Sequence, residues 1–163
     1  MARLGMLYAI TDEELAQLKA QKIEERYEYM VDEIQAELFA TEDCWELDMA
    51  WEGIQFCLGE GTWKEGNKVP YNIIFGGEII CDYNNEIISL KKAKDIKEIV
   101  DYLEINNLQE IIKNNFEDIR EDEYSLPKDE DELNYLLDWS KGILEFYQHA
   151  LDNQLNVIFT VDL

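Results

Sequence analysis

The sequence predicts a single α+β domain over residues 1–163, with a mixed β-sheet and about five helices packed against it. Short apolar runs close to both ends of the chain are typical of strands, so N- and C-terminal strands are expected in the sheet. Between them, apolar residues recur at helical spacing. No linker, repeat or low-complexity tract divides the chain, and 47% hydrophobic residues are enough for one core.

The first forty residues predict a strand followed by helix. Residues 5–10 (GMLYAI) form the strand, and Thr11 with Glu14 forms a capping box that opens a helix. An apolar stripe then continues to Leu38 with a shift of register near Lys22. The stripe fits one long helix or two helices with a break near residues 19–23.

The central stretch predicts a helix over residues 46–58, with Trp51 in a core. Thr41 or Asp43 would be its N-cap, and Gly59 or Gly61 would end it. A loop rich in glycine follows, and its Trp63 is expected to fold back on the body or to face a partner.

After this loop, residues 72–75 predict a short strand that ends at Gly76 and Gly77. A glycine pair within a strand pattern indicates a bulge, a bend or a close approach of backbone. Residues 78–82 and 86–89 then predict a β-hairpin around Tyr83, Asn84 and Asn85.

The second half predicts helices and a final strand. Ser89 would cap a helix that carries apolar residues from Ala93 to Leu103, and a short helix follows over residues 108–116. After a loop, one last helix is expected from Asp129 or Asp131 to about Leu151, with Asn153 as its stop. Residues 155–161 form an apolar, β-branched strand that suits the centre of a sheet.

The order of these motifs resembles the YfbM-like family of small bacterial proteins. The resemblance rests on Leu47-Asp48-x-x-Trp51-x-x-Ile54-x-Phe56, a glycine stop, and an apolar run that ends in Gly76-Gly77-Glu78. It implies an α+β fold over nearly the whole chain and no established activity. Where the family's helix carries Lys and His, this chain has Met49 and Gln55, so chemistry that needs those two residues would be absent.

The charge restricts the partners that the protein can have. The formal net charge is −23, from 37 acidic and 14 basic residues. This disfavours nucleic acid and anionic membrane surfaces, which bind through Lys and Arg. It favours a basic protein partner, or simply a solvated acidic surface. No apolar run reaches membrane length and no signal peptide is evident, so we expect a cytoplasmic protein.

Known chemical motifs do not fit, and we expect no cofactor and no metal. The stretch from Gly61 to Lys68 has Asn67 where a phosphate-binding loop needs Lys, and residues 82–87 lack the glycine of a calcium loop. One histidine and three cysteines without zinc spacing make no metal site. The three cysteines suit reduced thiols. Without a recognisable catalytic set, a non-catalytic protein is favoured over an enzyme.

Two functions remain open. The first is a non-catalytic protein-binding module that neutralises a basic partner, with Trp63 and Tyr124 as contacts. The second is a small-molecule binder or enzyme that uses a cleft beside the Trp51 helix and the Gly76-Gly77 bend. The residues expected to line that cleft are Asp48, Trp51, Gln55, Gly76, Gly77 and Glu78. Asp48 and Glu52 would share a helix face, although so acidic a chain supplies such pairs by chance.

Overall fold

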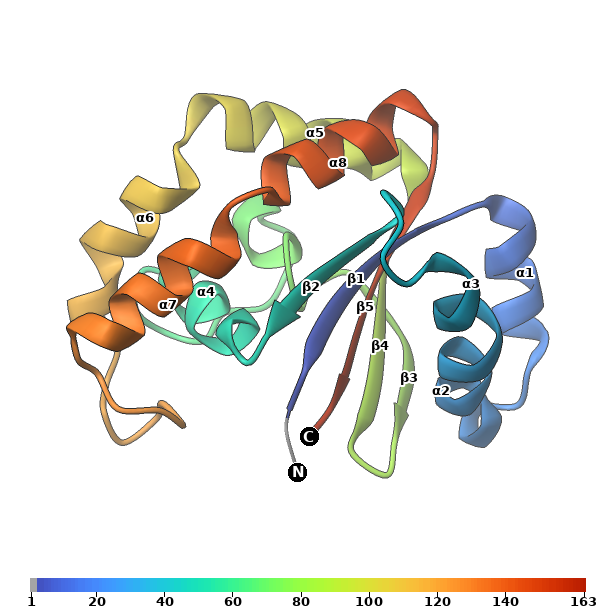
Figure 1. Cartoon of the computed structure of the whole chain (residues 1–163), viewed down its shortest axis with the longest axis horizontal. Helices are drawn as coiled ribbons and strands as arrows, with labels where there is room; N and C mark the ends of the chain where they lie inside the picture. The colour runs from blue at the N-terminus through green and yellow to red at the C-terminus, as the bar shows by residue number, and fades with distance from the viewer. Residues whose placement is uncertain (1–2) are drawn as a thin grey trace.

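A computed structural model describes residues 3–163 and shows one five-stranded sheet with helices on both faces (Figure 1). The strand order is β2-β1-β5-β4-β3, and every neighbouring pair is antiparallel. The strands are β1 (Gly5–Ile10), β2 (Cys44–Asp48), β3 (Glu78–Tyr83), β4 (Glu86–Lys91) and β5 (Asn156–Asp162).

The α+β class is confirmed, and both terminal strands lie in the sheet. The sheet is antiparallel rather than mixed. The register of Tyr8 with Cys44, and of Lys91 with Val157, shows the reason. The helical connection from β1 to β2 starts and finishes at the same end of the sheet, and so does the connection from β4 to β5. The second strand of each pair is therefore antiparallel to the first.

Strand β5 lies between β1 and β4, as its apolar sequence predicted. Its side chains alternate between the faces: Phe159 enters the larger core and Ile158 the smaller one. The sheet therefore separates two hydrophobic clusters.

The smaller cluster lies under α1 (Asp12–Ala20) and a second helical segment (Figure 1). The Thr11 capping box is present, and the chain leaves the helix at Gln21, so the two-helix alternative is correct. The second segment comprises a 3₁₀ turn (Ile23–Glu25), α2 (Arg26–Tyr29), a π-helical stretch (Met30–Gln35) and α3 (Ala36–Leu38).

The larger cluster lies under α4 (Ala50–Leu58), α5 (Ala93–Ile105), α6 (Leu108–Asn115), α7 (Glu130–Ser140) and α8 (Ile143–Asp152). Helices α5 and α6, the break between them at Asn106-Asn107 and the stop at Asn153 agree with the sequence prediction. A short 3₁₀ turn, Phe116–Asp118, follows α6.

The β3–β4 hairpin is also confirmed. Asn84 and Asn85 both have positive φ, at 53° and 66°, which is the turn geometry that asparagine tolerates best after glycine.

The helix predicted over residues 46–58 is wrong in its first turn. Residues 46–48 belong to β2, α4 begins at Ala50, and its N-cap is Met49 rather than Thr41 or Asp43. Leu47 fits both a strand and a helical spacing, so periodicity alone misplaced the boundary. Of the two predicted stops, Gly59 is the C-cap of α4.

Residues 72–75 do not form a strand. Asn72 ends a 3₁₀ helix (Val69–Asn72) and residues 73–75 form a turn, and side chains hold this backbone instead of a neighbouring strand. Ser89 is likewise not an N-cap, because β4 continues to Lys91 and α5 is capped at Lys92 without a side-chain hydrogen bond.

The long last helix is broken into α7 and α8 at Gly142, whose φ is 93°. A Cβ at this position would overlap the ring of Trp45, so the glycine lets the helices close over β2. No helix in residues 3–163 is long and apolar enough to cross a membrane.

Candidate functional site

Trp51 is largely buried in the core, and its remaining exposed edge lines a hollow of about 270 Å³ together with Arg3, Met49, Glu52 and Ser125. It is 4% exposed, its indole Nε1 donates to the Arg3 carbonyl at 2.7 Å, and its ring packs against Phe75 and Phe159. Gly5 lies beneath it, since a Cβ there would come within 2.7 Å of the ring. The indole is thus mainly a packing element, and none of the other five residues predicted for the cleft lines this hollow.

Gln55 is fully buried and holds the loop that follows α4. Its Nε2 donates to the carbonyls of Lys64 and Tyr71, at 3.2 and 3.1 Å. Its Oε1 accepts from the Phe75 amide at 3.1 Å. All three contacts are to backbone that has no strand partner, so the side chain is committed to structure.

Asp48 lies at the end of β2 with a φ of 50°. Its carboxylate accepts from the Met49 amide at 2.6 Å, and the Tyr135 hydroxyl lies 3.1 Å from the same amide. Asp48 is not on the helix, so it does not share a helix face with Glu52. Glu52 instead accepts from the Ser125 hydroxyl at 2.9 Å.

Trp63 and Tyr124, the two residues expected to contact a partner, both pack against the body of the protein. Trp63 is half-buried against Trp51, Phe56 and Phe75. Tyr124 is 7% exposed and donates to Glu132 at 2.5 Å. Their rings therefore hold their loops against the body.

Gly76, Gly77 and Glu78 form the bend before β3. Gly76 is buried against the backbone of residues 71–72, and Gly77 has a φ of 107° and fits against the Leu90 carbonyl. Gly77 and Glu78 line a cavity of about 320 Å³. Of the six predicted ligand-binding residues, these two meet at one cavity, and Asp48, Trp51, Gln55 and Gly76 are not part of its lining.

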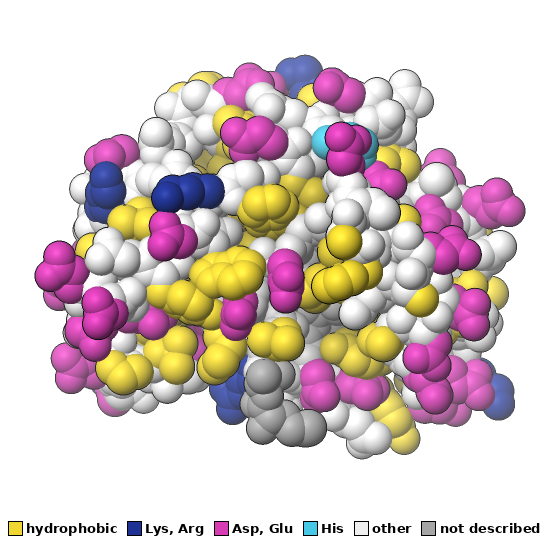
Figure 2. Space-filling model, in the orientation of Figure 1, with side chains coloured by type: hydrophobic (Ala, Val, Ile, Leu, Met, Phe, Trp, Pro, Cys, Tyr) yellow, Lys and Arg dark blue, Asp and Glu magenta, His cyan; other side chains and the backbone are white. Residues whose placement is uncertain are grey.

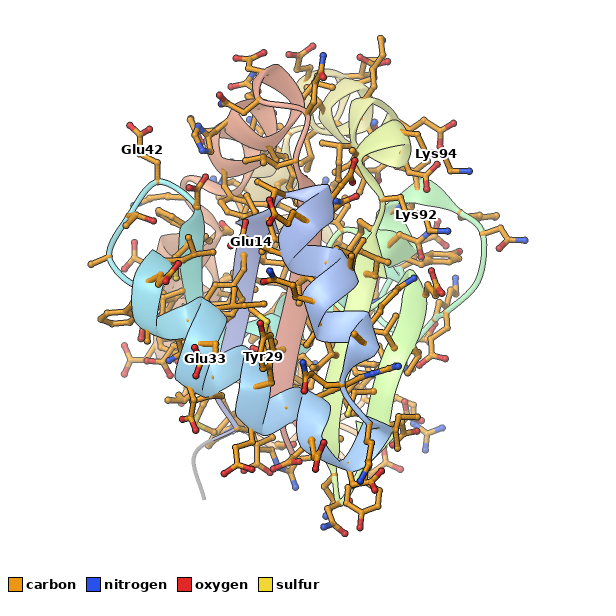
Figure 3. The ribbon with its side chains drawn as sticks, turned by 90° about the vertical axis from the view of Figure 1, so that its right-hand side faces the viewer. Glu14, Tyr29, Glu33, Glu42, Lys92 and Lys94 are labelled. Carbon is orange, nitrogen blue, oxygen red and sulfur yellow. The ribbon has the colours of Figure 1, made fainter. Side chains whose placement is uncertain are left out.

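We call this space the lysine cavity, because Lys91, Lys92 and Lys94 line it together with the start of α5. Glu78 on its wall makes ion pairs with Lys19 at 3.5 Å and with Lys92 at 3.6 Å. Figure 3 shows Lys92 and Lys94 at the edge of the molecule where α5 begins.

Lys91 is 3% exposed and lies on the larger-core face of β4. Its Nζ donates to the Ile74 carbonyl and to the Ser89 hydroxyl, and lies 5.5 Å from the centre of the Phe159 ring. Burial lowers the pKa of this amine well below its ordinary value. The strand alternation of Ile87, Ser89 and Lys91 could have revealed this inward position, had the predicted strand not ended at Ser89.

A second feature lies where β2 meets α7, α8 and the end of α3. Two adjacent hollows, of about 310 and 300 Å³, share Cys44 and Trp45. We call them together the tryptophan groove. The remaining lining residues are Phe39, Ala40, Thr41, Glu42, Glu46, Trp139, Gly142, Glu145, Phe146 and His149.

The groove has exposed apolar groups and an unsatisfied donor. Phe39 is 55% exposed, and the Trp45 indole Nε1 is buried without an acceptor among the described residues. Burial raises the pKa of the Cys44 thiol to about 11, which makes it a poor nucleophile near neutral pH. His149 Nε2 lies 2.7 Å from Asp43 Oδ1 and ties α8 to the rim of the groove.

Sequence reasoning did not single out Trp45, Phe39 or Trp139, because they come from three segments that only the fold brings together. No cluster of three or more His, Cys, Asp or Glu side chains within residues 3–163 has the geometry of a metal site.

Comparison with known proteins identifies a family. A solved structure, a protein of unknown function called YfbM from Escherichia coli, matches with a TM-score of 0.63 and 18% identity, over 97% of this chain and 99% of that one. At this identity, the match shows a shared fold. No curated protein matches the chain. The model of the family described as Domain of unknown function (DUF1877) matches residues 1–160. The chain therefore belongs to the DUF1877 family.

Proposed function

We propose that this protein is a non-catalytic interaction module that binds an extended, basic segment of a partner protein in the tryptophan groove. The observation that carries the proposal is an apolar groove, lined by acidic residues, that opens along an edge strand of the sheet.

The edge of β2 is available because this strand has β1 as its one neighbour in the sheet. One hollow takes its lining from Phe39 and Ala40, after α3, and from Trp139 on α7. These helices cover opposite faces of the sheet (Figure 1), so a hollow that touches both passes across the edge of β2. An extended segment can pair with such an edge through its backbone.

The apolar surface of the groove provides pockets for alternate side chains of that segment. Figure 2 shows hydrophobic side chains gathered across the middle of this face, over α7 and β2, with acidic side chains between and around them. Aromatic side chains of this kind contribute most to binding when a partner covers them.

The acidic residues of the groove favour a positively charged partner. Glu42, Glu46 and Glu145 line the groove, and neither Lys nor Arg is among its lining residues. The one basic residue between residues 24 and 48, Arg26, donates to the carbonyls of Lys19, Gln21 and Ile80. The acidic charge of this region is therefore left for a basic partner.

The test is a titration with a short synthetic peptide of alternating lysine and valine, followed by NMR of the backbone amides. Shifts are expected to concentrate on β2 and its flanks. A peptide of alternating glutamate and valine should not bind.

Two groove variants, each with a control variant elsewhere on the surface, distinguish specific binding in the groove from non-specific binding. Phe39→Ala and Glu46→Lys should each weaken binding at least about tenfold, or about 1.4 kcal/mol. Their controls are Ile105→Ala, at an apolar side chain that is 83% exposed on α5, and Glu13→Lys on α1. Equal loss in the controls, or shifts spread over the whole acidic surface, would overturn the proposal.

A further inference from the structure

We infer that the basic segment adds to the sheet as a further strand, antiparallel to β2, with a basic residue beside Glu46 and an apolar residue on either side of it. This arrangement rests on the proposed function, since it requires the tryptophan groove to be the binding site. It specifies in addition the direction of the segment, the residue of β2 that it pairs with and the order of its side chains. The carrying observations are the open backbone of β2 and the different surroundings of its two faces.

The two edge strands of the sheet, β2 and β3, differ in what covers them. Beside β3, the Arg26 guanidinium donates to the Ile80 carbonyl at 2.6 Å, and Cys81 Sγ donates to the Ile23 carbonyl at 3.5 Å. A shift of register between Ile79 and Cys81 also interrupts the pairing of β3. Covering segments and bulges of this kind prevent an edge strand from pairing with another chain. A partner strand therefore has to use the other edge.

The backbone of β2 is open at Cys44 and Glu46. The Ala9 N–H donates to the Asp43 carbonyl at 2.8 Å, so the backbone of Asp43 faces β1. Because the backbone groups of successive residues point to opposite sides of a strand, Trp45 also faces β1, while Cys44 and Glu46 face outward. The Cys44 N–H is bonded within the preceding turn, and within residues 3–163 no side chain bonds to the backbone of these two residues. The Cys44 carbonyl and both backbone groups of Glu46 are thus left for a partner strand.

An antiparallel strand fits these groups. A residue placed opposite Glu46 in such a pair exchanges two hydrogen bonds with it, from N–H to carbonyl in each direction, and the Cys44 carbonyl can accept a further bond. Every neighbouring pair in the sheet is already antiparallel, and antiparallel pairing is slightly more stable per residue than parallel pairing. The next strand is therefore expected to continue the same pattern.

The two faces of β2 set the order of side chains in the partner. Glu46 shares its face with Cys44, which packs against the smaller core, whereas Trp45 packs against the larger core. Directly opposite residues have their side chains on the same face, so the residue opposite Glu46 lies on the side of exposed Phe39. A lysine or arginine there can pair with the Glu46 carboxylate and lay its apolar stem on the phenyl ring. The residues before and after it lie beside Trp45 and Trp139, where apolar side chains fit.

The charges at the two edges agree with this choice. The Glu78 carboxylate at the start of β3 is already paired with Lys19 and Lys92, whereas Glu46 makes no ion pair within residues 3–163. Figure 3 shows Lys92 on one side of the molecule and Glu42, which also lines the groove, on the other. A basic strand therefore finds uncompensated negative charge at β2.

The experiment compares three versions of one peptide of alternating lysine and valine: unmodified, N-methylated at every lysine, and N-methylated at every valine. In the inferred register the lysine N–H groups point to β2 and the valine N–H groups point away from it. Methylation of the lysines should weaken binding at least about tenfold, and methylation of the valines should leave it largely unchanged. A peptide with the same residues in two blocks, all lysines before all valines, should also bind at least about tenfold more weakly.

Hydrogen exchange in the protein is a second readout. With saturating unmodified peptide, the Glu46 amide should exchange at least about tenfold more slowly, because it gains an acceptor. The Trp45 amide faces β1 and is the matched control, so its exchange should change little. Equal slowing at the two amides would show a general stabilisation instead of new hydrogen bonds, and would contradict strand addition.

The arrangement is wrong if both methylated peptides bind as well as the unmodified one. It is also wrong if methylation of the valines is the harmful change, which would indicate a parallel strand or the opposite register. In either case the unmodified peptide would still shift the amides of β2 and still respond to Phe39→Ala, so the groove would stay the binding site. If the unmodified peptide does not bind in the groove, the proposed function fails and strand addition fails with it.

Discussion

The two faces of the sheet are covered in different ways. On one face, five α-helices of eight or more residues enclose a core rich in aromatic rings, with Trp51, Phe75 and Phe159 in mutual contact. On the other, α1 and a helical segment with a π-helical stretch cover a smaller core without such a ring cluster. We therefore expect the large face to contribute most of the stability of the fold and the small face to open first.

The location of the two candidate sites follows from this difference. Both the lysine cavity and the tryptophan groove are lined by helices of the large face, where long helices meet the edges of the sheet. Of the residues of the smaller core, Leu90 on β4 lines the cavity and Cys44 on β2 lines the groove, and residues 39–42 after α3 also line the groove. The following changes test the comparison, from the largest expected effect to the smallest.

The largest effect is expected from Phe159→Ala on β5. Phe159 is fully buried against Trp51 and Phe75, so its loss should lower the free energy of unfolding by about 3–5 kcal/mol. Denaturant unfolding would measure the change. Ile158→Ala, on the next residue and the opposite face, is the matched variant and should cost less. An equal or larger loss there would contradict the ranking of the faces.

Gln55→Leu should lower stability by about 2–3 kcal/mol, because it leaves the Phe75 amide and two carbonyls without their partner. The loss should come with faster hydrogen exchange in residues 63–75 and little change in α1. Uniform exchange changes over the whole chain would show that Gln55 does not act through this loop.

Thiol labelling reports how easily each face opens. Cys57 lies in the larger core and Cys81 in the smaller one, and both are free thiols. At about pH 8, Cys81 should react at least about tenfold faster than Cys57, which is a difference of about 1.4 kcal/mol in the free energy of opening. Equal rates would mean that both faces open in one cooperative step.

The pH dependence of Cys57 gives a further check on that measurement. Burial raises the pKa of this thiol from 9.0 to about 12, so the folded state keeps the proton that the unfolded chain releases. Its contribution to stability is complete below pH 9.0 and is lost as the pH rises towards 12. Cys57→Ala should remove this part of the alkaline decline.

The smallest effect is expected from Thr11→Ala. The capping box joins Thr11 and Glu14 in both directions, and its loss should cost about 1 kcal/mol. Hydrogen exchange should quicken in α1 and not in α4. Faster exchange in α4 would show that the two faces are more tightly coupled than their separate cores suggest.

Several elements could be predicted because their signals are local. The Thr11 capping box, the asparagine turn and the apolar strand β5 each depend on residues close together in sequence. Of the two candidate sites, the lysine cavity had a local signal only in Gly77 and Glu78, and the tryptophan groove had none. Trp45, Phe39 and Trp139 belong to separate elements, and the burial of Lys91 depends on the position of Ile74 and Phe159.

The sequence by itself determined the fold class, the family and most of the strands and helices, because patterning and caps depend on hydrogen bonds and burial within a few residues. Only the tertiary structure decided where contacts between residues far apart in the sequence override the local sequence pattern. Trp45 requires the break at Gly142, and Gln55 and Lys91 hold the backbone of residues 71–75 out of the sheet. In each case a side chain far away in the sequence supplies the contact, and no spacing along the chain encodes it.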